Sequence, residues 1–282
     1  MKVLLLNGSS NLKGCTYTAL EEIAKTLQEE GIDTEIFQIG AEPLRDCIGC
    51  GGCRKGNGCV FRDDCVNEFV EKAKTADGFV FGTPVYYAHP SGRIMSFLDR
   101  AFYSGGAAFR FKPGMAVASA RRAGTTASLD AINKYFGINQ MPTVGSTYWN
   151  MVHGNCPEEV RQDLEGLQTM RNAAKCMAWM LKCFEAGKAQ NIALPDTKKE
   201  VLLILSGKLL YFQKGRFRCR HFMHIINFGQ IGEKIMHFQA KISKTCWRII
   251  RICMRLVCMD QIFCSLHQLS SPDHADWRCY SS

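Results

Sequence analysis

Small polar residues follow the first apolar segment of the chain, residues 3–6, and their types suit a phosphate-binding loop. The candidate binding residues are Ser9, Ser10, Lys13, Gly14, Cys15 and Thr16. A loop between a buried strand and a helix turns backbone N–H groups and the positive end of the helix dipole toward one point, where a phosphate can bind. The loop lacks both GxGxxG and GxxxxGK with a following Ser or Thr, which argues against a Rossmann fingerprint and an ATP-type P-loop. An ordinary tight turn is the alternative.

Two further segments combine turn residues with groups that suit an aromatic, anionic ligand. One offers two tyrosine rings beside a stiffening proline, and its candidates are Thr83, Pro84, Val85, Tyr86 and Tyr87. The other carries two guanidinium groups before a Gly-Thr-Thr turn, and its candidates are Ser119, Arg121, Arg122 and Gly124. Taken singly, the tyrosines could be packing residues and the arginines a solvated face. Together with the first loop, the segments predict a slot for a planar ring joined to a phosphate.

A glycine-rich loop holds four cysteines in the pattern CxxCxxC, followed after five residues by one more. These residues are Cys47, Cys50, Cys53 and Cys59. Four thiolates on such a loop can enclose a compact metal centre, either an iron–sulfur cluster or zinc. Free or redox-active thiols are the other interpretation. Cys65, Cys176 and Cys183 lie outside the pattern, and we expect them to be packing residues on helices.

Apolar strands and amphipathic helices alternate over the first 200 residues. The predicted strands are residues 2–7, 34–39, 78–82, 114–119 and 141–148. The predicted helices are residues 16–30, 63–75, 92–102, 125–136 and 157–187. The last helix should pack on the sheet through Leu164, Leu167, Met170, Ala174, Met177 and Leu181. Such alternation indicates a parallel sheet with helices on both faces, whose ligands bind at the carboxyl ends of the strands.

The positive charge of the chain is concentrated in its last 82 residues. Residues 1–200 carry 23 Lys and Arg against 22 Asp and Glu, whereas residues 201–282 carry 12 against 4 and hold five of the seven His. A basic amphipathic element at residues 247–255 could bind a membrane surface or nucleic acid. A metal site is a weaker interpretation, because Cys246, Cys253, Cys258 and Cys264 form no CxxC pair. We favour a frameshift or read-through near Glu200, so that residues 196–282 are not a conserved domain.

The apolar segments give a first expectation of location. Residues 3–6 are too short for the apolar core of a secretory signal, and no stretch approaches the roughly 18 apolar residues of a membrane-spanning helix. We therefore expect a cytoplasmic protein without a membrane span. Because the excess of basic charge belongs to residues 201–282, for which we favour a frameshift or read-through origin, no nucleic-acid partner is expected.

Four pieces of the sequence together resemble the flavodoxin-like NAD(P)H-dependent FMN reductases, in particular the iron–sulfur flavoprotein branch. They are LLLNGSSNLKGCTYTAL, CIGCGGC, GTPVYYAHPSG and SARRAGTT, and the resemblance covers about residues 1–195. It implies an α/β fold with a doubly wound five-stranded parallel sheet of order 2-1-3-4-5, flanked by helices. It also implies one FMN, with its phosphate at Ser9–Thr16 and its isoalloxazine on Thr83–Tyr87, near Ser119–Gly124. Many relatives carry Asn at the position of Cys15.

The resemblance implies an oxidoreductase that passes electrons from NAD(P)H through FMN to a quinone, a flavin or another acceptor. Arg121 and Arg122 would then contact the phosphates of NAD(P)H or the charge on reduced flavin. In relatives with this cysteine spacing it implies a 4Fe–4S cluster, and with a cluster the protein would be an electron carrier. A non-enzymatic flavin-binding or redox-sensing module is the third alternative. A homodimer or homotetramer is expected, and nothing in the family resembles residues 201–282.

Overall fold

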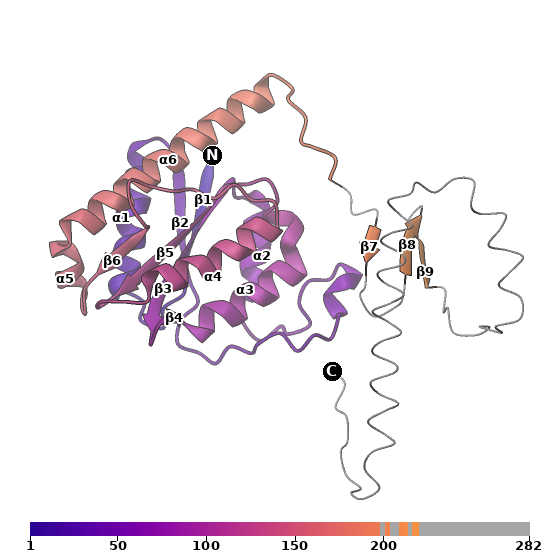
Figure 1. Ribbon diagram of the computed structural model, residues 1–282, viewed down its shortest axis with the longest axis horizontal. Helices are drawn as coiled ribbons and strands as arrows, with labels where there is room; N and C mark the ends of the chain where they lie inside the picture. The colour runs from indigo at the N-terminus through magenta and orange to yellow at the C-terminus, as the bar shows by residue number, and fades with distance from the viewer. Residues whose placement is uncertain (198–200, 204–208, 214–215, 220–282) are drawn as a thin grey trace, which may run out of the picture. The chain divides into compact units, whose positions relative to one another are not determined.

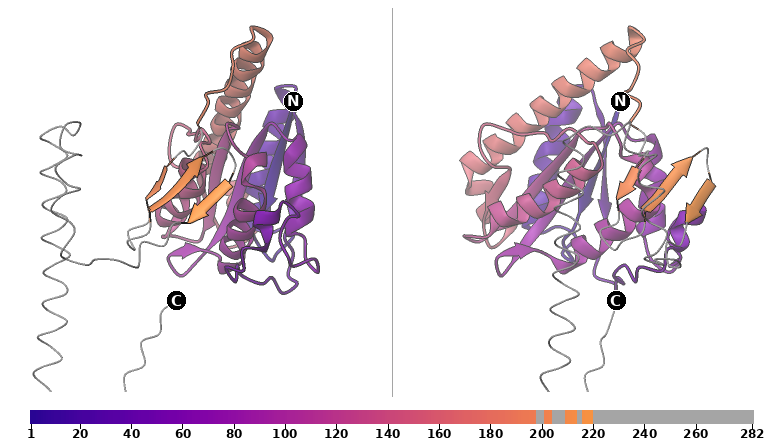
Figure 2. Two further views of the ribbon diagram at one scale, coloured as in Figure 1. Left: turned by 90° about the vertical axis from the view of Figure 1, so that its right-hand side faces the viewer. Right: turned by 45° about the vertical axis from the view of Figure 1, so that its right-hand side comes forward.

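A computed structural model describes residues 1–197, 201–203, 209–213 and 216–219 of the chain (Figure 1). The chain divides into two units between Asp196 and Thr197. The first unit has helices on both faces of a central sheet, and Figure 2 shows these layers from two further directions. The predicted α/β class, a five-stranded parallel sheet flanked by helices, is confirmed.

The parallel strands are β1 (Lys2–Asn7), β2 (Asp33–Gln38), β3 (Gly78–Tyr86), β5 (Gly114–Ala120) and β6 (Met151–His153). They lie in the order β2-β1-β3-β5-β6. A two-residue strand, β4 (His89–Pro90), turns back antiparallel on β3, and the sheet departs from the predicted order by that one strand. The apolar run of β1 is completely buried, as expected for a strand covered on both faces.

Each face of the sheet has its own apolar core. One core packs against α1 (Cys15–Glu29), α5 (Pro157–Gln162) and α6 (Leu164–Ala189), and the other against α2 (Val66–Thr75), α3 (Gly92–Gly105) and α4 (Thr125–Ile138). Two short 3₁₀ turns, η1 (Gly52–Lys55) and η2 (Gly106–Ala108), contact α3. The second core is rich in phenylalanine, with Phe69 and Phe97 in edge contact at 5.1 Å between ring centroids. Successive residues of β5 alternate between the two cores.

The prediction for the edge strand was wrong. Residues 141–148 were expected to be the fifth strand, but β6 comes later and pairs Met151 with Ala118. The earlier stretch makes one isolated bridge, between Thr143 and Gly114, at the beginning of β5. Pro142 lacks a backbone N–H and Gly145 has no side chain to pack, so this stretch is a poor ladder partner.

The long closing helix is broken at Asp163, where α5 ends and α6 begins. The Asp163 carboxylate accepts hydrogen bonds from Gly166 N at 2.9 Å and from His153 N at 2.7 Å, so it caps α6 and fixes the end of β6. Leu164 follows this cap directly and is exposed, contrary to expectation. The predicted burial of Cys176 and Cys183 was also wrong, because both lie on the solvent face of α6.

In the second unit, the described residues form an antiparallel sheet of β7 (Val201–Leu203), β8 (Leu209–Gln213) and β9 (Arg216–Cys219). No strand was predicted there, because the apolar residues come in clumps without a regular period. The candidate basic element at residues 247–255 and the candidate ligands Cys246, Cys253, Cys258 and Cys264 lie outside the described residues. Among the helices that the structure describes, none is long and apolar enough to cross a membrane.

Candidate functional site

Hydrogen bonds between its own side chains and backbone fix the conformation of the loop before α1. Asn7 Oδ1 accepts from Ser9 N at 3.1 Å, Ser9 Oγ accepts from Asn11 N at 3.1 Å, and Asn11 Oδ1 accepts from Lys13 N at 3.3 Å. In the described part of the chain no side chain caps the first turn of α1, and that turn contains no acidic residue. Its N–H groups are therefore available to an anion. Asn7 and Asn11 were not predicted as residues of this site, although short polar side chains in a turn are the signal for such bonds.

One backbone and one side-chain hydrogen bond join this loop to β3 and to the N-cap of α3. Gly8 N donates to Gly82 O at 2.8 Å, and Ser91 Oγ donates to Gly8 O at 3.1 Å. A Cβ on Gly8 would lie 2.7 Å from Gly82 O, so only glycine permits this approach. The first and second predicted segments are therefore neighbours at the carboxyl ends of β1 and β3.

The third predicted segment contacts both of the others. Thr16 Oγ1 and Ser119 Oγ lie 2.7 Å apart and share a hydrogen bond. Gly124 has a φ of +91°, and a Cβ there would lie 2.7 Å from Val85 Cγ1 and 2.9 Å from Ala88 Cα. The structure thus brings the three predicted segments together at one edge of the sheet.

Exposure separates the predicted residues of this site into two groups. Ser10, Lys13, Tyr86, Tyr87, Arg121 and Arg122 are exposed and can meet a ligand. Ser9, Gly14, Thr16, Thr83 and Ser119 are buried, and Cys15, Pro84, Val85 and Gly124 are half-buried. The Thr83 hydroxyl is occupied within the fold, since it donates to Pro84 O at 2.9 Å and accepts from Ser91 N at 3.1 Å.

Tyr87 lies at the tip of the β3–β4 turn in an unusual conformation. Its φ is +58°, a region that residues with a side chain seldom adopt, and its side chain is fully exposed. The turn therefore presents an aromatic ring to solvent at a cost in backbone strain. Such strain is frequent where a side chain is held for binding.

Cys15 lies at the first position of α1, beneath the end of β6. Its thiol donates to Gly154 O at 3.6 Å. Burial is the main cause that raises the pKa of the Cys15 thiol, and the charges of Glu158 and Glu159 act in the same direction. The thiol is therefore neutral at physiological pH and adds no negative charge to the anion-binding end of the helix.

The four cysteines of the CxxCxxC loop differ in exposure. Cys50 is exposed, Cys47 and Cys53 are half-buried, and Cys59 is buried. Among the described residues no three Cys, His, Asp or Glu side chains are gathered closely enough to hold a metal ion. Four free thiols on one loop are suitable ligands for an iron–sulfur cluster. That the four thiols bind one metal centre stays a prediction.

A buried charge pair lies beneath this loop and was not predicted. The Arg100 side chain is 1% exposed and binds the Asp64 carboxylate through Nη1 at 2.5 Å and Nη2 at 3.0 Å. Its Nε donates to Cys59 Sγ at 3.3 Å. The guanidinium thus anchors the end of the loop to α3. An arginine within the apolar stripe of an amphipathic helix, between Leu98 and Ala101, is the sequence signal that could have revealed it.

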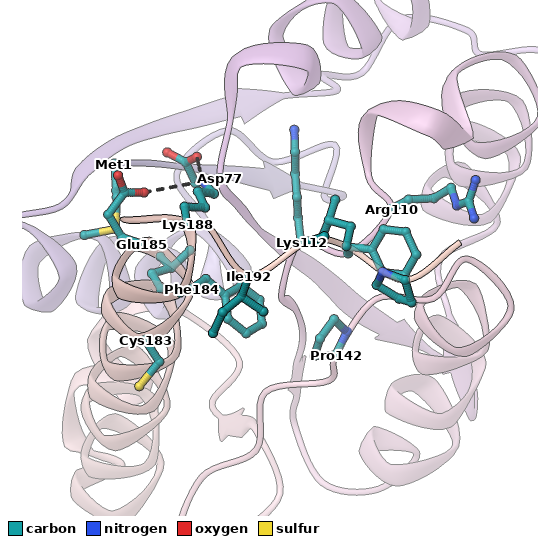
Figure 3. A pocket seen from close by; sticks show the side chains of 16 residues that line it. Met1, Asp77, Arg110, Lys112, Pro142, Cys183, Phe184, Glu185, Lys188 and Ile192 are labelled. Atoms are coloured by element: carbon teal, nitrogen blue, oxygen red, sulfur yellow. Dashed lines mark hydrogen bonds and ion pairs between the residues drawn. The ribbon is translucent and has the colours of Figure 1, made fainter. Parts of the chain in front are cut away.

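A cavity of about 480 Å³ lies at the opposite end of the strands and is not part of this site (Figure 3). Met1, Asp77 and Lys112 line it and stand just before or near the amino ends of β1, β3 and β5. Lys112 Nζ donates to Ala73 O at 3.0 Å, which satisfies a carbonyl at the end of α2, and burial lowers the pKa of this amine. Ligands of such sheets bind at the other edge, so this cavity does not compete as the FMN site.

The comparisons with known proteins agree with this geometry. The family model described as NADPH-dependent FMN reductase matches residues 1–155. An iron-sulfur flavoprotein of Methanocaldococcus jannaschii is 34% identical over 190 residues, covering 64% of this chain and 98% of that protein. A second iron-sulfur flavoprotein of the same organism is 30% identical over 197 residues, with coverages of 64% and 98%.

A solved structure supports the fold alone. RosB, with the bound intermediate 8-demethyl-8-formylriboflavin-5'-phosphate, matches with a TM-score of 0.50 at 13% identity, covering 80% of this chain and 98% of that one. At this identity the likeness carries no information on residue roles.

Proposed function

Because the chain belongs to the NADPH-dependent FMN reductase family, in its iron–sulfur flavoprotein branch, we propose that it passes electrons from NAD(P)H to a quinone, a flavin or another acceptor. FMN binding and redox chemistry are what the family provides. The observation that carries the proposal for this chain is the Thr16–Ser119 hydrogen bond, because it holds the uncapped end of α1 beside the end of β5.

The loop before α1 is the proposed phosphate site of FMN. Its binding residues would be Ser9, Ser10, Lys13, Gly14, Cys15 and Thr16. The Lys13 ammonium and the dipole of α1 favour a doubly charged phosphate, and the absence of acidic residues from the first helical turn leaves that attraction unopposed. The neutral Cys15 thiol fits the same requirement.

The loops after β3 and β5 are the proposed sites of the ring and of NAD(P)H. Tyr86 and Tyr87 are exposed and present flat faces on which an aromatic ring can stack. Arg121 and Arg122 are exposed on the loop after β5 and suit the phosphates of a dinucleotide. When bound, FMN supplies hydride and electron transfer, and the residues of the chain supply position and electrostatics.

The second candidate is an electron carrier that also holds a 4Fe–4S cluster. Two observations favour it: four free thiols lie on one loop, and the relatives with full-length matches are named iron-sulfur flavoproteins. The proposed ligands are Cys47, Cys50, Cys53 and Cys59. Arg100 would then donate a hydrogen bond to one of the ligand sulfurs.

Anaerobic purification of the full chain tests both proposals. We expect flavin absorption, FMN released on denaturation, and NAD(P)H oxidation by the reconstituted protein. Iron, sulfide and broad absorption near about 400 nm would support the cluster. Cys50→Ser should lose that iron and keep FMN, whereas Cys65→Ser, just beyond the loop, should keep both. Colourless protein that takes up no added FMN would contradict the flavoprotein proposal.

The proposed assembly is a homodimer or homotetramer. Sedimentation equilibrium of the FMN-loaded protein measures it directly, and a monomer at micromolar concentration would contradict it.

A further inference from the structure

Arg100 joins α3 to one predicted ligand of the cysteine loop. Its side chain is 1% exposed and donates through Nε to Cys59 Sγ at 3.3 Å. The two Nη atoms bind the Asp64 carboxylate, and Nη1 also donates to Arg45 O at 3.1 Å. Because these bonds hold the planar guanidinium in place, its Nε–H stays directed at the sulfur.

The backbone of Cys59 is fixed from a second side. Asn67 of α2 accepts from Cys59 N at 2.8 Å, and it donates to Cys59 O at 3.1 Å and to Phe61 O at 2.7 Å. The Phe61 ring lies against the guanidinium groups of Arg45 and Arg100, whose Cζ atoms are 4.8 and 5.0 Å from its centroid. The fold of the chain therefore sets the position of the Cys59 sulfur.

The turn that carries Cys53 packs against the segment that contains Cys59. A Cβ on Gly52, the first residue of η1, would overlap Val60 Cγ1, so only glycine permits this close approach. Gly52 directly precedes Cys53, and Val60 directly follows Cys59. The segments that bear two of the predicted ligands are therefore in contact with each other.

A hydrogen bond to a ligand sulfur is one of the features that set the reduction potential of an iron–sulfur cluster. An N–H donor stabilises negative charge on the sulfur, and a reduced cluster carries one more negative charge than an oxidised cluster. We propose that Arg100 is a positioning residue that raises the potential of a 4Fe–4S cluster through its hydrogen bond to the ligand Cys59. This inference rests on the second candidate of the proposed function.

The ion pair with Asp64 allows the hydrogen bond to be separated from the net charge. Arg100→Met combined with Asp64→Asn removes one positive and one negative charge, so the net charge of the chain is unchanged while the Nε–H donor is lost. Replacing both members of a buried ion pair costs much less stability than removing one of them. We therefore expect this double variant to fold.

Redox titration of the full chain, purified without oxygen and followed by the EPR signal of the reduced cluster, measures the potential. We expect about a tenfold weaker electron affinity in the double variant, a fall of about 59 mV for one electron. Arg100→Lys should also lower the potential, since it keeps the charge beside Asp64 but has no Nε. Arg93→Lys is the matched control on α3, because the Arg93 guanidinium donates to the backbone oxygens of Ala41 and Glu42, and it should keep the wild-type potential.

A loaded cluster with the same potential in wild type and in both Arg100 variants would overturn this inference alone. An equal fall in Arg93→Lys would overturn it as well, because the contact with the sulfur would then have no special role. A wild-type chain that takes up no iron and sulfide on anaerobic reconstitution would contradict the cluster candidate itself, and with it the role of Arg100. Melting temperatures of the same samples identify a variant that fails to fold, in which case the other Arg100 variant decides.

Discussion

The hydroxyl oxygens of Thr16 and Ser119 lie 2.7 Å apart, although 103 positions separate the two residues. Thr16 is 1% exposed and Ser119 is 4% exposed, so little water competes for this bond. Thr16 is the second residue of α1 and Ser119 is the next-to-last residue of β5, and these two elements bear separate parts of the proposed FMN site. The bond therefore sets the distance between the phosphate end and the third predicted segment.

Ser119→Ala should weaken FMN binding about fivefold, because one buried hydrogen bond contributes about 1 kcal/mol. Quenching of FMN fluorescence during titration of apoprotein measures the dissociation constant. Thr26→Val is the control: this residue is also buried in α1, but its hydroxyl donates to Glu22 O within the same helix, away from the proposed site. If both variants weaken FMN equally, the tie between α1 and β5 has no special role.

Tyr87→Gly should stabilise the protein and impair its activity at the same time. Glycine adopts positive φ without strain, so we expect a gain of about 1 kcal/mol in the free energy of unfolding. Loss of the ring should lower kcat/KM for NAD(P)H oxidation. Tyr87→Phe keeps an aromatic ring and should therefore keep the wild-type kcat/KM. Thermal unfolding and steady-state kinetics measure the two effects. A glycine variant with full activity would show that the exposed ring does not contact a ligand.

Asp64→Asn should destabilise the protein by about 3–5 kcal/mol, since it leaves the buried Arg100 charge without its partner. Urea unfolding measures the change. Asp63→Asn is a matched control on the neighbouring residue, because the Arg45–Asp63 pair has both side chains more than half exposed. The control should cost less than about 1 kcal/mol. Similar losses in the two variants would contradict the special role of the buried pair.

Glu35 gives the protein a stability that depends on pH. Hydrogen bonds from Lys2 and Lys72 are the largest causes that lower the pKa of this carboxyl. A lowered folded-state pKa contributes stability above the unfolded pKa of about 4.3, and that stability is lost as pH falls through the folded value. Glu35→Gln should therefore lose less stability than wild type between pH 7 and pH 3. Melting temperatures over this range test it, and parallel curves would contradict it.

Sequence patterns within short segments were sufficient to predict most of the strands and helices of the first unit. Buried apolar runs identified β1, β3 and β5, and Gly31, with a φ of +79°, follows α1 as expected. The edge strand could not be predicted in the same way, because residues 141–148 and Met151–His153 are both plausible strands in isolation. The choice between them depends on which one meets the free side of β5, and that is a tertiary contact.

The site was predicted as three segments, but their mutual contacts were not. Residue types indicated the anion loop, the tyrosines and the arginines. Nothing in the sequence shows that Thr16 would reach Ser119, or that Arg100 would lie under Cys59, since these pairs are distant in the chain.

Among the described residues, Met141 is the last residue in the sequence that belongs to one core of the sheet, and Leu181 is the last that belongs to the other. Both precede the division after Asp196. We therefore expect the first unit, Met1–Asp196, to keep its fold when the residues that follow it are replaced. With a fluorescent reporter or an electrode-binding peptide in their place, the yellow colour and the melting temperature of the first unit should be unchanged.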